Sequence, residues 1–199
     1  MQGKSDFDLT PRSAQKGLVA VEFALVAIVF LTFVLGIIET SRAMYILNTL
    51  PMVTKNAARA AANTDWRDSD AMARVRQQAL FRSTAGTLAW GDPITDANVK
   101  IDYLSLARQS DGSLTMTPIT SLPSCPSRNR QTCLADPNNP SCIRLVRVRI
   151  CRTGNSSDCD PVPYRTLLSL VAMNFSLPTS PSIVSAESLG YQVGAPVCP

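Results

Sequence analysis

The sequence predicts an α+β fold: a long N-terminal transmembrane helix continues into a small extracytoplasmic domain that carries an antiparallel sheet of three or four strands and is stapled by disulfides. Three observations predict it. An apolar run covers residues 18–38, all six cysteines follow residue 124, and short segments with alternating apolar residues occur after residue 98.

The apolar run at residues 18–38 is long enough to span a membrane. Its 21 residues extend about 30 Å as a helix, the thickness of a hydrocarbon core. A cleavable secretory signal would have a shorter apolar core followed by a small-residue cleavage site, which residues 37–42 do not supply. Glu22 is the one charged residue in the run, and a charge inside a membrane segment is expected to be functional.

Helical character continues beyond the membrane segment. Apolar residues recur at helical spacing through residues 39–63, and residues 56–62 are rich in alanine, the strongest helix former. Pro51 removes a backbone donor, so we expect a kink there. The chain is therefore divided into a leader peptide (1–17), a transmembrane helix (18–38), a helical stalk (39–63) and an extracytoplasmic α+β domain (64–199).

The composition argues against several classes of function. The chain has no histidine, which removes Ser-His-Asp catalysis and zinc sites built on imidazole. It has no glycine-rich phosphate loop or paired carboxylate motif, and its net charge of +4 is not gathered into basic blocks. We expect no catalytic residue, no metal, no cofactor and no nucleic-acid partner.

The cysteines are candidates for disulfides. Their even number beyond a membrane segment fits an oxidising compartment and places the C-terminal part outside the cytoplasm; reduced thiols in a cytosolic domain are the alternative. Six cysteines allow fifteen pairings, and the sequence does not choose among them. The candidates are Cys125, Cys133, Cys142, Cys151, Cys159 and Cys198.

The domain after residue 64 combines one further helix with several strands. Ser69 or Asp70 is expected to cap a helix that runs to Ser83, with an apolar stripe of Met72, Val75 and Ala79. Alternating residues predict strands at 99–103, 143–152 and 183–189, and Asp111-Gly112 predicts a turn. Residues 117–142 are expected to form a disulfide-pinned loop, and residues 164–175 a short helix or a connection.

Two arginines alternate with the buried residues of the strand at 143–152. Val146, Val148 and Ile150 are expected to face the core, whereas Arg147 and Arg149 point away from it. The arginines form either a solvated face or a contact with an acidic partner subunit.

The N-terminal residues resemble a known processing signal. A polar leader ends at Lys16-Gly17, Glu22 is the fifth residue after the glycine, and Phe23 follows. This arrangement resembles the class III signal of type IV pilins and pseudopilins. Residues 17–26, 36–39 and 56–62 together resemble the TadE-like family (TadE and its relative TadF), which are minor pseudopilins of bacterial tight-adherence, or Flp-type, pilus systems.

The resemblance implies a mechanism of processing and assembly. A prepilin peptidase would cut between Gly17 and Leu18, and Glu22 of one subunit would meet the new amine of Leu18 on a neighbour, with Phe23 beside it. The implied partners are the peptidase, other pilin or pseudopilin subunits, the inner-membrane assembly platform and membrane lipid. The implied location is the bacterial inner membrane, with a cytoplasmic N-terminus and a periplasmic domain, or an extracellular pilus. The alternative is an unprocessed membrane-anchored interaction or adhesion module, in which Glu22 has no special role.

Overall fold

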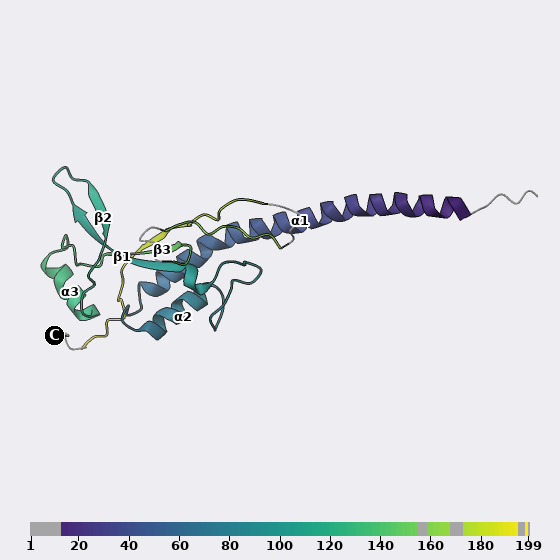
Figure 1. Cartoon of the computed structure of the whole chain (residues 1–199). Coiled ribbons are helices and arrows are strands. Elements are labelled where there is room, and N and C mark those ends of the chain that lie inside the picture. Colours follow the sequence, from purple (N-terminus) through teal and green to yellow (C-terminus); the bar gives the residue numbers. More distant parts are fainter. Residues whose placement is uncertain (1–12, 155–158, 168–172, 195–197, 199) are drawn as a thin grey trace, which may run out of the picture.

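One long helix dominates the molecule. The computed structural model describes residues 13–154, 159–167, 173–194 and 198 (Figure 1). Helix α1 spans Ser13–Ala61, 49 residues or about 70 Å, and continues through Pro51. Its N-terminal part projects away from the domain, and its C-terminal part packs against it (Figure 1).

The domain is built on a four-stranded antiparallel sheet, which confirms the predicted α+β class. The strands are β1 Val99–Arg108, β2 Leu114–Pro118, β3 Leu145–Ile150 and β4 Ser182–Ser185, in the spatial order β2-β1-β3-β4. β1 extends five residues beyond the predicted strand, whereas β3 and β4 are shorter than predicted. β2 was not predicted, because all five of its residues are exposed and leave no alternating pattern.

The core lies between the sheet and the second half of α1. Val146, Val148 and Ile150 are buried, as the alternation predicts. α1 contacts β1, β3 and β4, and Ala57 and Ala58 are fully buried in its packed face. Short side chains at these positions let the helix backbone approach the neighbouring elements closely.

Helix α2, Ser69–Ala79, packs against α1 and buries the predicted stripe of Met72, Val75 and Ala79. The predicted cap and end were wrong. Asp68 is the N-cap, because its carboxylate accepts a hydrogen bond of 2.9 Å from the backbone N–H of Ala71. The helix stops at Ala79, and Phe81 has a left-handed φ of 58° that does not continue a helix.

The cysteine-rich segment holds a helix that the sequence did not reveal. Helix α3, Pro126–Ala135, lies inside the predicted loop at 117–142. Pro126 occupies the first helical turn, where a missing N–H costs nothing, and buried Ser127 and Asn129 replace the usual apolar stripe. Between residues 164 and 175 the described parts are a connection with a bridge from Pro163 to Ser176, and residues 168–172 lie outside the described residues.

Candidate functional site

The predicted processing junction lies at the free end of α1. Gly17 is helical, and Leu18 and Phe23 are 72% and 74% exposed. The apolar residues up to Ile38 are mostly exposed too, and none of the most apolar stretch is buried inside the domain. This half of α1 is long and apolar enough to cross a membrane. Residues 1–12 of the predicted leader lie outside the described residues, so cleavage stays a prediction.

Glu22 stands alone on this exposed surface. Leu18 and Glu22 are four residues apart and therefore share one face of the helix. Among the residues whose side chains the structure describes, none forms an ion pair or hydrogen bond with Glu22. The chain supplies no described partner for this carboxylate.

A second glutamate, seventeen residues further along α1, has the opposite surroundings. Glu39 is 0% exposed and forms an ion pair of 3.2 Å with Arg42. Its carboxylate also accepts hydrogen bonds from the hydroxyl of Tyr164 and, at 3.1 Å, from the backbone N–H of Leu167. The sequence comparison included Glu39 only as part of the TadE-like pattern, and its burial was not predicted.

Arg42 fastens two loops to the helix. Its Nε donates to the carbonyl of Trp90 at 2.9 Å, its Nη2 to that of Asp92 at 2.6 Å, and its Nη1 to that of Arg165 at 2.7 Å. The planar guanidinium suits this task because it offers five donors in a fixed geometry. Glu39, Arg42 and Tyr164 are here called the junction cluster. Glu39 and Arg42 hold the loop at 90–92 and the segment at 164–167 against α1.

Tyr164 completes the junction cluster. Its ring stacks on Phe175 with centroids 4.6 Å apart, and the guanidinium carbon of Arg42 lies 5.2 Å from its centroid. Burial raises the pKa of Tyr164, the hydrogen bond to Glu39 raises it further, and the charge of Arg42 opposes both. The hydroxyl therefore remains a donor to Glu39 at neutral pH, and the cluster is a structural clamp with its charges paired.

The six cysteines form three pairs in the structure. Cys125–Cys198, Cys133–Cys142 and Cys151–Cys159 have Cα separations of 6.2, 5.0 and 4.8 Å. The first pair links the tail to the residue just before α3. The other two close short loops beside β3.

The arginine row on β3 is engaged within the chain. Asp102 on β1 lies opposite Arg147 in the sheet register. One of its carboxylate oxygens accepts from Arg147 at 3.1 Å and from Arg149 at 2.7 Å. All three side chains are half-buried, so neither a fully solvated row nor a free acidic-partner contact describes them.

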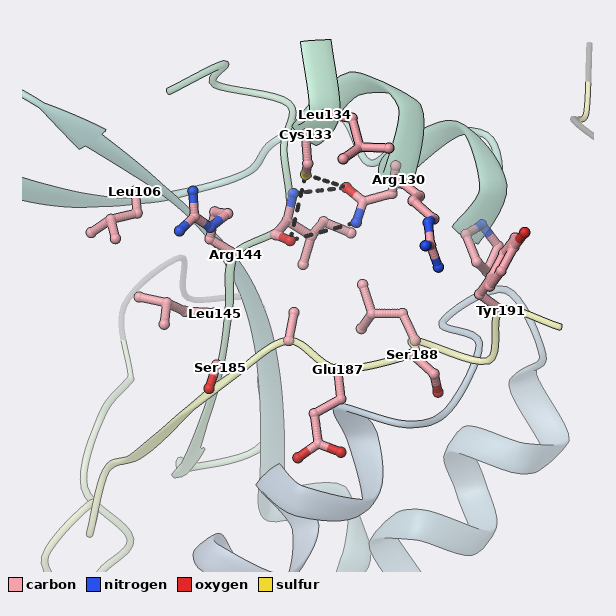
Figure 2. Close-up of a pocket in the computed structure, with 15 residues that line it drawn as sticks. Leu106, Arg130, Cys133, Leu134, Arg144, Leu145, Ser185, Glu187, Ser188 and Tyr191 are labelled. Carbon is pink, nitrogen blue, oxygen red and sulfur yellow. Dashed lines mark hydrogen bonds between the residues drawn. The ribbon is translucent and has the colours of Figure 1, made fainter. Parts of the chain in front are cut away.

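A surface hollow of about 580 Å³ lies between α3 and the ends of β3 and β4 (Figure 2). Exposed Arg130, Arg144 and Glu187 line it together with apolar Leu106 and Leu134. Its buried polar group, Asn129, accepts at 2.8 Å from the backbone N–H of Ile143 and is thereby satisfied inside the chain. The hollow presents no convergent set of groups that defines a ligand.

The comparison with known families gives one match. The model of the TadE-like protein family matches residues 17–63. It covers the predicted processing junction at Gly17, the apolar half of α1, and the packed half up to two residues beyond the end of the helix. It confirms the resemblance seen in the sequence. No curated protein and no solved structure matches the chain. The match indicates a protein associated with a tight-adherence pilus.

Proposed function

We propose that this chain is a minor pseudopilin that takes part in assembling a tight-adherence pilus. The observation that supports it best is a coincidence of position: the TadE-like match begins at Gly17 and runs along a helix whose first half is apolar and mostly exposed. That half anchors the protein in the inner membrane, with the disulfide-bonded domain on the periplasmic side.

Processing occurs after Gly17. Glycine is the weakest helix former apart from proline, so the helix opens most easily at this residue. It also lets a peptidase approach the backbone closely. Release of residues 1–17 leaves an α-amine on Leu18, at the membrane boundary.

Glu22 pairs with that amine on a neighbouring subunit. A carboxylate with no partner is unfavourable in the membrane, and an opposite charge from a second chain removes the penalty. Because both groups lie on the same helix face of each subunit, the pair would fix the axial register between neighbours. An unprocessed anchor would have no such amine, so processing distinguishes the two functions.

Processing is tested by the intact mass of the protein purified from cells that contain a prepilin peptidase. We expect the mass to correspond to residues 18–199. Gly17→Val should retain the leader, whereas Gly36→Val should be cleaved normally, because a Cβ at Gly36 meets no atom within 4 Å. A wild-type mass that includes residues 1–17 would refute the processed pseudopilin.

The role of Glu22 is tested by Glu22→Ala in the processed protein. We expect normal cleavage, unchanged unfolding of the domain and loss of pilus assembly, because the carboxylate has no partner among the described residues but is needed by a neighbour. Glu187→Ala removes an exposed glutamate from the domain and is the control. Normal piliation with Glu22→Ala would contradict the pairing.

A further inference from the structure

Exposed apolar side chains gather around α1 at the end of its apolar run. Ile38 and Tyr45 lie on one helix face with Arg42, and Trp90 and Leu167 approach from the two clamped loops. Trp90 is 77% exposed and Leu167 53%. Together these residues line a hollow of about 230 Å³. The group Ile38, Tyr45, Trp90 and Leu167 is called the collar below.

The junction cluster holds the collar in place. Arg42 binds the carbonyls on either side of Gly91, and Glu39 binds the N–H of Leu167. Trp90 has a left-handed φ of 56°, which is unfavourable for a bulky aromatic residue. Such a conformation persists where surrounding contacts fix it and is common at functional sites. The chain thus keeps a large apolar ring exposed at a cost to its own backbone.

The collar presents little net charge. Glu39 and Arg42 neutralise each other beneath it. The exposed side chains of Asp92 and Arg165 at its edge carry opposite signs. The collar therefore favours a binding surface that makes apolar contacts over one that carries charge.

The collar lies at the end of the apolar half of α1, and this position indicates what covers it. It adjoins the apolar half of α1, because Ile38 ends the apolar run and the side chains that bind the backbones of Trp90 and Leu167, Arg42 and Glu39, lie within one helical turn of Ile38. Figure 1 shows the loop after α2 and the segment before β4 reaching along α1 toward its free half. Tryptophan and tyrosine are enriched where membranes meet water.

We propose that the collar inserts into the headgroup region of the bilayer, so that the domain rests on the membrane through a second contact besides α1. The proposal rests on the membrane anchor proposed above. The contact sets the depth of α1: with Ile38 at one interface, Glu22 lies sixteen residues, or about 24 Å, along the helix toward the other. It thereby places the carboxylate just inside the opposite boundary, where the Leu18 amine is generated.

The two tryptophans of the chain provide the test and its control. Trp66 is half-buried beyond the far end of α1, which lies about 35 Å of helix from Ile38, and its ring centroid is 6.0 Å from that of Tyr103. Full-length Trp66→Phe reports on Trp90 alone, and Trp90→Phe reports on Trp66. Each is purified, reconstituted alone in phosphatidylcholine vesicles, and measured with nitroxide labels at the lipid headgroup, the upper acyl chain or the bilayer centre.

We expect headgroup and upper-chain labels to reduce Trp90 emission about two-fold, as for an interfacial ring, with little effect from the central label and little quenching of Trp66. Adding anionic lipid should not change the result. Quenching of Trp90 no greater than that of Trp66 would overturn the collar, including the case in which a second copy shields the ring. If Trp66→Phe destabilises the domain, the emission of Trp90 is obtained instead by subtracting the emission of the Trp90→Phe protein from that of the wild type. Flotation of the vesicles after an alkaline wash tests the α1 anchor separately. Protein that floats but has unquenched Trp90 refutes only the insertion of the collar. Protein that does not float refutes the membrane anchor and the collar insertion together.

Discussion

The two halves of α1 treat a glutamate in opposite ways. Glu22 in the apolar half is exposed and has no partner among the described residues, whereas Glu39 in the packed half is fully buried and has three. The difference shows which half the chain completes by itself. The packed half pairs its glutamate internally, whereas the described residues give the glutamate of the apolar half no partner.

Removing the charged partner of Glu39 is the variant expected to have the largest effect on stability. Arg42→Met should lower the free energy of unfolding by about 3–5 kcal/mol, because it leaves a buried carboxylate unpaired and three carbonyls without their donor. Denaturant unfolding of the protein in mild detergent, followed by near-ultraviolet circular dichroism, measures the loss. Arg59→Met on the exposed face of the same helix is the control, and a loss no larger than that control's would contradict the clamp.

A matched pair of alanines compares packing in the two halves. Ala58→Leu adds volume where α1 is fully buried and should cost about 1–3 kcal/mol of unfolding free energy. Ala24→Leu, in the exposed apolar half, should leave unfolding of the domain unchanged. The same unfolding measurement applies, and equal effects at the two sites would show that the halves do not differ in this way.

The stability of the domain at alkaline pH tests the burial of Tyr103, which packs near the C-terminal end of α1. Burial is the main reason that the pKa of Tyr103 rises from 10.0 to about 12; the charge of Arg76 works in the other direction and that of Asp65 adds to the rise. A folded-state pKa above the unfolded value gives stability that is full below pH 10 and is lost as the pH rises through about 12. At about pH 11 the loss should be about 1 kcal/mol, and Tyr103→Phe should remove it.

The control for this titration is Tyr45→Phe on the half-exposed face of α1. Tyr164 keeps its own alkaline contribution in both variants, since its pKa is also raised. Tyr103→Phe should therefore reduce the slope of stability against pH and not abolish it. Identical slopes in the two variants would contradict the assignment to Tyr103.

The sequence predicted those parts of the fold that have a periodic signal. The buried stripe of α2 and the alternation of Val146, Val148 and Ile150 both appear in the structure, because one face of each element meets the core. β2 has no buried face, and α3 buries polar side chains and is tied by Cys125 and Cys133 at either end. Periodicity cannot reveal elements that crosslinks and sheet pairing stabilise.

The candidate site was predictable only where its residues are neighbours in the sequence. Gly17, Leu18, Glu22 and Phe23 form one short pattern, and the family match begins there. The junction cluster joins Glu39 and Arg42 to groups at Trp90, Asp92 and Tyr164, up to 125 residues away. Glu39 and Arg42 are three residues apart and share a helix face, but neither their pairing nor their burial was predicted, because the burial depends on loops whose placement no local pattern indicates.

The spacing of the junction cluster also orders events during biosynthesis. Glu39 and Arg42 leave the ribosome 125 and 122 residues before Tyr164, and Leu167 follows later still. Until the loop at 90–92 follows, these two charges have only each other, one helical turn apart, and Glu39 has no further partner until Tyr164 is made. In the membrane anchor proposed above, α1 would be inserted before this clamp is complete. Docking of the segment at 164–167 onto Glu39 would then join the inserted helix to its folded domain.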